Sequence, residues 1–211
     1  MRDQHSPVAV FDFDGTVTTG ESFLPFMRYV VGPVRFWSGM GLLLPWLAAY
    51  ALGQISNRVI KEKVIGYFLK GRSVNEVSEL GKVYAQQILP YRVRDDAREQ
   101  FSWHLEKGHW LVLASASLSV YLEPWGKNNG FHGICGADLE VDDKGKITGR
   151  ILGNNCFGPE KLEAVHHWIG ERNPQKTYAY GDSHGDRELL DWADVKFFKG
   201  VPMAESGQKV I

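Results

Sequence analysis

The sequence predicts an α/β fold: a doubly wound, largely parallel sheet, an all-helical segment inserted after the first strand, and a β-hairpin at one edge. Three observations support this fold class. Short apolar runs end in glycine and polar residues, as strands buried on both faces of a parallel sheet do. Helical patterns separate these runs. Residues 21–90 show helical periodicity without a clear strand.

The first strand is expected at Val8–Phe11, a continuous apolar run that leads directly into acidic and glycine residues. The helical stretch that follows, residues 21–90, is predicted to form a cap domain over the carboxyl ends of the strands. A catalytic core domain would then be assembled from residues 1–20 and 91–211. The chain is longer than one average domain, which agrees with one core and one sizeable insertion.

The rest of the core is expected to alternate helices and strands. Further strands are predicted at residues 111–114, 177–180 and Val195–Phe198, and helices at Asp95–Glu106, 159–170 and 186–192. Residues 134–141 and 146–152 depart from simple alternation. They flank Asp142-Asp143-Lys144-Gly145, a good hairpin turn, and we interpret them as a β-hairpin at the edge of the sheet.

Composition limits the possible partners and compartments. The 211 residues include 24 Lys and Arg and 25 Asp and Glu, for a formal net charge of −1. No dense basic run is present, so we expect no nucleic-acid partner. Cys135 and Cys156 lack zinc-type spacing and are expected to be reduced thiols, as in a cytoplasmic protein. The first residues lack the long apolar stretch of a secretory signal, so export is not expected.

Polar residues follow the ends of three predicted strands. Asp12 and Asp14 follow the first, Ser115 the second and Asp182 the third, while Lys161 begins a predicted helix. Ligands bind at this edge of open α/β sheets. Mg²⁺ prefers oxygen ligands, and phosphoryl transfer needs its oxygens positioned and neutralised. Taken alone, Asp12 and Asp14 are equally compatible with an exposed turn, and the other strand ends favour a phosphoryl site.

These motifs resemble those of a known family. The order Asp-x-Asp-Gly-Thr, Ser after an apolar strand, Lys, and Gly-Asp-x-x-x-Asp resembles the haloacid dehalogenase superfamily. It is most similar to the phosphoserine-phosphatase-like hydrolases, which carry a helical cap after the first motif. The motifs span Asp12 to Asp186, nearly the whole chain. The segment after Phe198 departs from that subfamily, which usually continues with an Asn-Pro-containing segment.

The resemblance implies a chemical role for each acidic residue. Asp12 would be the nucleophile that forms an aspartyl-phosphate intermediate. Asp14 would protonate the leaving group and then deprotonate the attacking water. The side chains of Asp12 and Asp182 and the backbone carbonyl of Asp14 would bind Mg²⁺. We expect crowding by Asp12 and Asp182 to raise the pKa of Asp14.

It also implies roles for the remaining motif residues. Ser115 would donate a hydrogen bond to a phosphoryl oxygen, with Ser117 as the lesser candidate. Lys161 would screen the charge between nucleophile and phosphate. Asp186 would orient Lys161 or a metal-bound water, and Thr16 would stabilise the first loop.

Other polar residues receive structural interpretations. His166 and His167 lie in the middle of a predicted helix and are expected at the surface. His184 lies within the last motif, where a place at the mouth of the site and a solvated loop are equally compatible with the sequence. Cys135 and Cys156 are expected to be packing residues.

Two residues of the predicted cap are candidates for substrate contact. Glu21 lies nine residues after Asp12, where phosphoserine phosphatases carry an acidic residue facing the substrate amine. It could equally cap the first cap helix, because acidic side chains favour helix N-termini. Arg58 could face an anionic group of the substrate from the cap.

Residues 36–53 contain no charged side chain and reach the length at which a membrane span must be considered. Gly39, Gly41 and Pro45 interrupt the segment, and proline kinks or breaks a helix. Three interpretations remain: two short helices packed in the cap, an interfacial helix in peripheral contact with a membrane, and a true span. The second would make the protein cytoplasmic but membrane-associated.

The leading functional hypothesis is a Mg²⁺-dependent phosphatase acting on a small amino or alcohol phosphate, such as phosphoserine or histidinol phosphate. Relatives with similarly apolar caps act on phosphatidylglycerophosphate, so a lipid phosphate is the alternative substrate class. A phosphoacceptor domain or a non-catalytic interaction module is a further alternative. The Asp12 and Asp14 pair argues against it, because a phosphoacceptor needs no acid/base group beside its aspartate.

Overall fold

The structure is a computed structural model that describes residues 3–203. Its sheet has the strand order β4-β3-β2-β1-β5-β6-β7. The strands are β1 (Val8–Phe11), β2 (Trp110–Leu118), β3 (Gly133–Val141), β4 (Ile147–Leu152), β5 (Thr177–Gly181), β6 (Val195–Phe198) and β7 (Val201–Pro202). The five strands from β3 to β6 in this order are parallel, and β4 and β7 are antiparallel at the two edges. The predicted fold class is confirmed.

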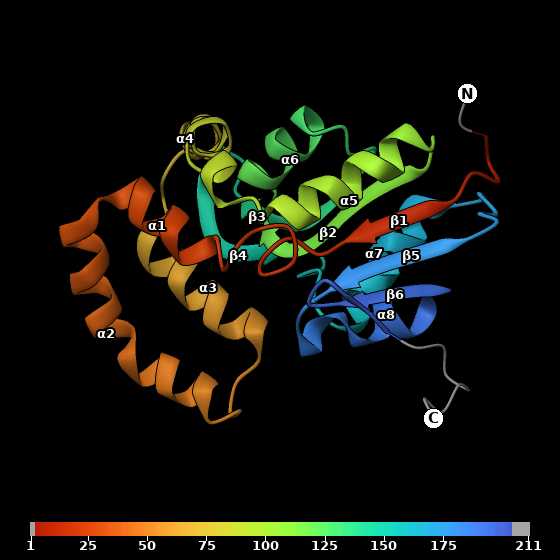
Figure 1. Cartoon of the computed structure of the whole chain (residues 1–211). Helices are drawn as coiled ribbons and strands as arrows, with labels where there is room; N and C mark the ends of the chain where they lie inside the picture. Colours follow the sequence, from red (N-terminus) through yellow and green to blue (C-terminus); the bar gives the residue numbers. More distant parts are fainter. Residues whose placement is uncertain (1–2, 204–211) are drawn as a thin grey trace.

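Helices cover both faces of the sheet (Figure 1). The core helices are α5 (Asp95–Glu106), α6 (Ser119–Asn128), α7 (Pro159–Ile169) and α8 (Arg187–Trp192). Strand β1 shows why both faces must be covered, because all four of its side chains are buried. Ala9 and Phe11 belong to the hydrophobic cluster shared with α5 and α6, whereas Val8 and Val10 belong to the cluster shared with α7 and α8. This alternation places β1 at the centre of a doubly wound sheet.

Strand β2 is longer than predicted. It continues from Trp110 through Ser115 and Ser117 to Leu118, instead of ending at Ala114. Its pairing with β3 shifts register between Ala114 and Leu118. Because the two serines are two residues apart in a strand, their side chains project toward the same side, near the carboxyl end of β2.

Four helices lie between β1 and the core helices, and we call them the insertion. They are α1 (Phe23–Val31), α2 (Pro33–Ala51), α3 (Asn57–Phe68) and α4 (Val74–Gln87), followed by the short 3₁₀ helix η1 (Leu89–Arg92). Helices α1 to α3 lie beyond the carboxyl ends of β1 and β5 (Figure 1). The division into a core domain and a cap domain at residues 20 and 91 stays a prediction.

Helix α2 corrects the interpretation of residues 36–53 as two short helices, because it runs unbroken through Pro45. Proline removes the hydrogen bond to the carbonyl four residues earlier and crowds it. That carbonyl belongs to Gly41, and both residues are exposed, with open space beside Gly41. Solvent can therefore hydrate the freed carbonyl. Among the described residues, no helix has the length and apolar character that crossing a bilayer requires.

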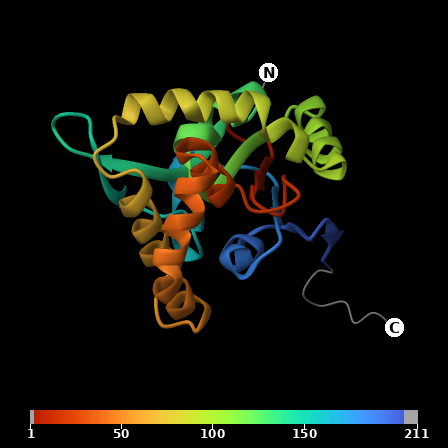
Figure 2. The same ribbon diagram turned by 90° about the vertical axis from the view of Figure 1, so that its left-hand side faces the viewer.

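The β3–β4 hairpin projects beside the insertion (Figure 2). Its turn contains Gly145 with a φ of 69°, a conformation that favours glycine. A bridge between Ser73 and Lys146 ties the start of α4 to this turn. Strand β7, which pairs antiparallel with β6, was not predicted. It accounts for the start of the segment after Phe198, and the remainder of that segment lies outside the described residues.

Candidate active site

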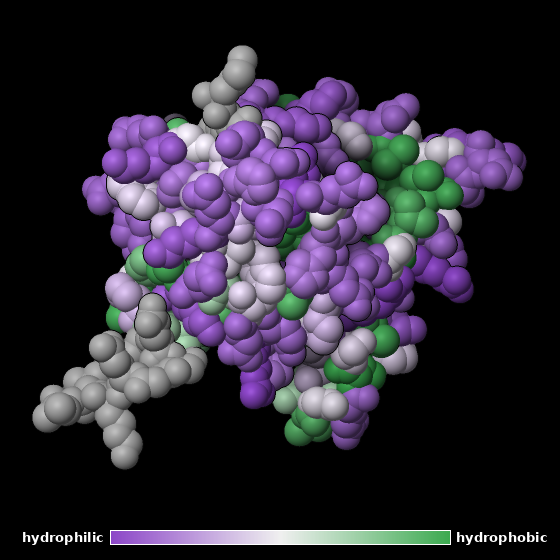
Figure 3. Space-filling model, turned by 90° about the vertical axis from the view of Figure 1, so that its right-hand side faces the viewer, coloured by the Kyte–Doolittle hydropathy of each residue, from purple (hydrophilic) through white to green (hydrophobic). Residues whose placement is uncertain are grey.

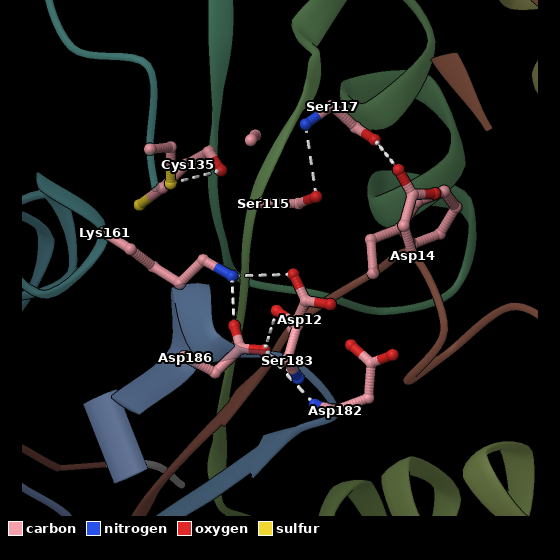
Figure 4. A network of polar contacts seen from close by, with 12 residues as sticks. Asp12, Asp14, Ser115, Ser117, Cys135, Lys161, Asp182, Ser183 and Asp186 are labelled. Carbon is pink, nitrogen blue, oxygen red and sulfur yellow. Dashed lines mark hydrogen bonds and ion pairs between the residues drawn. The ribbon is translucent and has the colours of Figure 1, made fainter. Parts of the chain in front are cut away.

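The carboxyl ends of β1, β2 and β5 open into one cavity of about 510 Å³ beneath the insertion. The cavity brings together residues from four separate motifs, namely Asp12, Asp14, Ser115, Lys161 and Asp182. Figure 4 shows their side chains converging from the strand ends and from α7. The other wall of the cavity consists of residues from α1, α2 and α3.

Asp12 and Lys161 form a buried ion pair at the base of the cavity, with 2.7 Å between Asp12 Oδ1 and Lys161 Nζ. Burial raises the pKa of Asp12 to about 7, although Lys161 opposes this rise. Burial alone would lower the pKa of Lys161, but attraction by Asp12 and Asp186 outweighs it and raises that pKa. The lysine is therefore charged and holds one oxygen of Asp12 in place, as a positioned nucleophile requires.

Asp186 positions both Lys161 and the loop after β5. One carboxylate oxygen accepts a short hydrogen bond from Lys161 Nζ. The other accepts hydrogen bonds from the backbone N–H groups of Asp182 and Ser183 and from the Ser183 hydroxyl. Asp186 is fully buried, and both of its carboxylate oxygens accept hydrogen bonds within the protein. It therefore orients Lys161, one of the two roles that the sequence suggested.

The acidic residues suit a divalent cation. Carboxylate oxygens of Asp12, Asp182 and Asp186 lie within 4.8 Å of one another. Both carboxylate oxygens of Asp186 accept hydrogen bonds and Asp186 does not line the cavity, whereas Asp12 and Asp182 do, so these two would be the better placed to offer oxygen ligands to Mg²⁺. Gly15, with a φ of +82°, packs against Asp182, and a Cβ atom on it would lie 2.2 Å from Asp182 Oδ2. Glycine at this position allows the two loops to approach closely enough for the two carboxylates to share an ion.

Asp14 lines the cavity on the side toward Ser117 of β2. Its Oδ2 accepts a hydrogen bond of 2.8 Å from Ser117 Oγ, and its Oδ1 is buried with no hydrogen-bond partner among the described residues. Burial is the main cause of its raised pKa. The expected cause, crowding by Asp12 and Asp182, is thus corrected. A carboxyl group that has a raised pKa and lines the cavity is suited to donate a proton to a leaving group.

A row of hydroxyl groups supports Asp14 from behind. Ser22 lies 3.0 Å from both Ser117 Oγ and Tyr121 Oη, and all three residues are buried. The Ser117 hydroxyl donates its proton to Asp14, so Ser117 Oγ accepts the hydrogen bond from the Ser22 hydroxyl. Sequence reasoning missed Ser22 and Tyr121, since only the packing of α1 against α6 and β2 brings them together.

The two serines of β2 have different positions. Ser115 lines the cavity and is buried, and its Oγ accepts a hydrogen bond from the backbone N–H of Ser117. The Ser115 hydroxyl proton is thereby directed away from that N–H and is available to an oxygen in the cavity. Ser117 instead supports Asp14. This arrangement favours Ser115 over Ser117 as the residue that would contact a phosphoryl group.

The first loop is stabilised by Thr18, which corrects the role expected of Thr16. The Thr16 hydroxyl is buried without a hydrogen-bond partner among the described residues. Thr18 Oγ1 donates toward the carbonyl oxygens of Phe13 and Gly20 at 3.2 and 2.7 Å. Both threonines follow the same Asp-Gly turn, so the sequence alone does not distinguish them.

Lys61 of α3 lines the insertion side of the cavity and was missed by the sequence analysis. It is buried, and its Nζ donates a short hydrogen bond to the carbonyl oxygen of Ala116. Burial lowers the pKa of Lys61 to about 8, although Asp14 opposes this change. The signal that could have found it is its position on the helix face that carries Ile60, Val64 and Phe68.

The position of Glu21 is compatible with both interpretations of the sequence, a cap for the first helix of the insertion and a residue facing the substrate. Its Oε1 accepts a hydrogen bond of 2.6 Å from the backbone N–H of Leu24, at the start of α1, so it caps the helix. It also lines the cavity.

Arg58 corrects the expectation of a substrate contact. Its guanidinium donates to the carbonyl oxygens of Gly153 and Ile151 and to Glu62, and it lies outside the lining of the cavity. It joins α3 to the β3–β4 hairpin, and Lys61 occupies the position facing the cavity.

The cysteines and the remaining histidines that the sequence singled out have no place in this cavity. Burial raises the pKa of Cys135 to about 11 and that of Cys156 to about 12, so neither is a reactive thiolate. The His166 ring packs edge-on against Trp192. His167 and His184 are exposed and do not line the cavity.

Fold and site together define an enzyme of the phosphatase class: a doubly wound α/β core with a helical insertion over a paired aspartate, a lysine and a second acidic loop. The chain belongs to the haloacid dehalogenase-like hydrolases, whose family model matches residues 9–191. The predicted resemblance is confirmed.

Individual relatives agree with this assignment. Protein CicA of Caulobacter vibrioides is 34% identical over 202 residues, which cover 94% of this chain and 90% of that protein. Phosphoserine phosphatase SerB1 of Mycobacterium tuberculosis is 30% identical over 191 residues, covering 86% of this chain and 61% of that protein.

Solved structures share the fold. A protein of unknown function from Bordetella pertussis Tohama I matches with a TM-score of 0.79 and 22% identity, covering 91% of this chain and 89% of that one. A phosphoserine phosphatase solved as an analogue of its phospho-aspartyl intermediate matches with a TM-score of 0.63 and 20% identity, covering 91% and 85%.

Proposed function

We propose that this protein hydrolyses phosphate monoesters through a phosphorylated Asp12. The free carboxylate oxygen of Asp12 attacks phosphorus, and the bond between phosphorus and the ester oxygen breaks. Asp14 gives its proton to the departing alkoxide. Asp14 then takes a proton from water, which attacks phosphorus and breaks the bond to Asp12. The products are an alcohol and inorganic phosphate.

The observation that carries this proposal is the arrangement around Asp12 and Asp14. Lys161 holds Asp12 Oδ1 at 2.7 Å, while Asp14 Oδ1 is buried in the same cavity and has no hydrogen-bond partner in the part of the chain that the structure describes. Lys161 thus favours the charged form of Asp12, against the burial that raises its pKa, beside a carboxyl group whose raised pKa suits it as an acid. A phosphoacceptor domain or a non-catalytic module would have no use for this second group, so the arrangement favours a hydrolase.

Mg²⁺ is the cofactor we propose, held by the side chains of Asp12 and Asp182 and by the backbone carbonyl of Asp14. When bound, it would neutralise phosphoryl oxygens that the three aspartates would otherwise repel. Ser115 would donate a hydrogen bond to a phosphoryl oxygen, and Lys161 would reduce the repulsion between Asp12 and the phosphate.

For the substrate, the first candidate is a small amino or alcohol phosphate, such as phosphoserine or histidinol phosphate. The insertion side of the cavity presents one acidic and one basic side chain, Glu21 and Lys61, which together would suit a zwitterionic leaving group. The relative SerB1 is named a phosphoserine phosphatase. Free Cys135 and Cys156 agree with a cytoplasmic location for such an enzyme.

A second candidate is a lipid phosphate such as phosphatidylglycerophosphate, and a specific observation favours it. Most of the insertion side of the cavity is apolar, with contributions from α1, α2 and α3. The apolar lining residues are Phe23, Leu24, Leu47, Ile60 and Val64. Such a wall is suited to a leaving group that carries acyl chains, because burying those chains against it would remove apolar surface from water.

A panel of phosphomonoesters tests the proposal. Phosphoserine, histidinol phosphate, an aryl phosphate and phosphatidylglycerophosphate in detergent are assayed for phosphate release with Mg²⁺ and with EDTA. We expect activity that EDTA abolishes and that Asp12→Asn lowers at least ~10³-fold. Full activity of Asp12→Asn would disprove the assignment of the nucleophile.

A further inference from the structure

We propose that the outer side of α2 binds the surface of an anionic lipid bilayer and brings the mouth of the catalytic cavity to that surface. This inference concerns a binding partner and does not rest on the chemistry proposed for Asp12 or on the identity of the substrate.

Helix α2 has one buried side and one exposed side, and both are apolar. Phe36, Gly39 and Leu43 face inward, and Gly39 lets α2 pack closely on Phe68 of α3. The exposed side carries large apolar residues at high solvent exposure. These are Val34 (84% exposed), Trp37 (62%), Leu42 (68%) and Leu44 (62%), and Leu52 (73%) directly follows the helix.

Beyond Arg35, this exposed side lacks the charged residues that normally face water. From Phe36 to Gly53 there is no charged residue, whereas a helix at the surface of a globular protein normally carries charged and polar residues on its solvent side. The opposite end of the molecule is mostly hydrophilic (Figure 3). Contiguous exposed apolar residues of this kind mark a binding surface.

The charges beside α2 indicate which partner fits. Between Ser22 and Arg72 the sequence has seven basic residues and a single acidic one, Glu62, although the whole chain has a net charge of −1. The basic residues are Arg28, Arg35, Arg58, Lys61, Lys63, Lys70 and Arg72. Arg28, Arg35, Lys63 and Lys70 are exposed. Basic residues beside an exposed apolar helix favour a bilayer with anionic headgroups.

The same charges argue against a second copy of this chain as the partner. Two insertions placed face to face would bring like charges together, which disfavours association.

Aromatic residues also suit the bilayer interface, where one end of the ring is apolar and the other hydrated. Trp37 and Trp46 are both exposed on α2, and Lys63 Nζ lies 4.1 Å from the centre of the Trp46 ring.

The position of α2 connects this surface to the catalytic cavity. Leu47 and Tyr50 of α2 line the cavity that contains Asp12. In Figure 1, α2 lies at the end of the molecule toward which β1 and β5 point, and Figure 2 looks onto that end. A bilayer in contact with the outer side of α2 would therefore lie next to the cavity. An amphiphilic phosphate could then enter the site without leaving the interface.

Co-sedimentation of the full chain with vesicles tests the inference. The vesicles consist of phosphatidylcholine, with or without phosphatidylglycerol. We expect binding to the vesicles that contain phosphatidylglycerol, weakened by added salt, because screening reduces attraction between exposed charges. The double variant Trp37→Ser, Leu44→Ser should lower the partition coefficient about 10-fold, because it removes two apolar anchors. Arg28→Gln with Arg35→Gln should lower binding to the anionic vesicles.

Matched controls make the test specific. Leu152 is 57% exposed on β4, and Leu152→Ser should bind vesicles as the unchanged protein does. Asp12→Asn should also bind vesicles as the unchanged protein does. The vesicle test therefore gives its answer even if the catalytic proposal fails. Absence of binding to the anionic vesicles at low salt would overturn the inference. So would equal binding by the Trp37, Leu44 variant. A dimer in lipid-free buffer that this variant dissociates would also overturn it, since a second copy would then cover α2.

Discussion

The catalytic edge of the core and the exposed side of α2 show opposite relations between polarity and burial. At the edge of the sheet, Asp12, Lys161 and Asp186 are charged groups that the fold buries and pairs with one another. On α2, Trp37 and Leu44 are apolar groups that the fold leaves exposed. Both arrangements oppose the tendency of a soluble domain to bury apolar groups and hydrate charges.

Buried charged groups and exposed apolar groups both point to function, but they do so through different evidence. Buried charges must be compensated in the same structure, so their partners can be identified from distances. Exposed apolar residues have no compensation within the described chain, and their partner has to be inferred from neighbouring charges. The catalytic site is therefore specified residue by residue, whereas the surface of α2 specifies only a class of partner. The predictions below test each side of this contrast, from the largest expected effect to the smallest.

The largest effect is expected from Asp14→Asn, which removes the proposed acid but keeps its size. Loss of a general acid costs about 10²–10⁴-fold in rate. The loss should be greatest for an alkyl phosphate, whose leaving group needs the proton, and smaller for an aryl phosphate. The kcat/KM values on the two substrates measure the difference, because they report the steps up to departure of the alcohol and not the later attack by water. Equal losses on both substrates would contradict the role of Asp14 as an acid.

Leu43 and Leu44 test the two sides of α2 within one turn. Leu43 is 6% exposed and Leu44 is 62% exposed. Leu43→Ala should lower the free energy of unfolding by about 2–3 kcal/mol because it leaves a cavity. Leu44→Ala should change it by less than about 0.5 kcal/mol. Urea denaturation measures both. A comparable loss at Leu44 would mean that this side of α2 is covered in solution.

Gly15→Ala tests the close approach of the two acidic loops. The new methyl group would displace the Asp182 carboxylate, so Mg²⁺ affinity should fall about 10–100-fold. The Mg²⁺ dependence of phosphate release gives this value. Gly71→Ala is the matched control, because Gly71 has a φ of +81° and no atom within 4 Å of the added Cβ. If both variants lose affinity equally, backbone strain and not the contact with Asp182 explains the effect.

The smallest effect concerns Lys61, whose lowered pKa of about 8 means that it loses its proton as the pH rises through that value. For an anionic substrate, the KM of the unchanged enzyme should therefore increase several-fold above pH 8. Lys61→Met should have the higher KM already at pH 7 and no such increase. Lys63→Met, which alters an exposed lysine of the same helix, serves as control. A KM that rises with pH in Lys61→Met as in the unchanged enzyme would exclude this role.

The sequence predicts the catalytic edge well because each of its motifs is local. A carboxylate, hydroxyl or glycine directly after a buried strand is brought to the same edge by the parallel sheet itself. Asp12, Asp14, Ser115 and Asp182 meet at one cavity in this way, and their chemical roles stay predictions. The fold class was predictable for the same reason, since β1 and β5 are short apolar runs with clear ends.

Features that depend on contacts distant in sequence could not be predicted. Lys61 reaches the cavity, and Arg58 does not, because of the way α3 packs on the β3–β4 hairpin. Thr18 rather than Thr16 supports the first loop because of the path of that loop. Helix α2 continues through Pro45 because the residue four positions earlier is an exposed glycine, and proline rules alone predict a break.

Trapping the covalent intermediate tests the central claim most directly. The enzyme is mixed with a phosphomonoester carrying radiolabelled phosphate, quenched in acid, and digested for mass spectrometry after borohydride reduction. We predict that the label is acid-stable and released by hydroxylamine, and that reduction converts Asp12 to homoserine. Asp12→Asn should retain no label. Turnover without any labelled protein, or a label on another residue, would contradict Asp12 as the nucleophile.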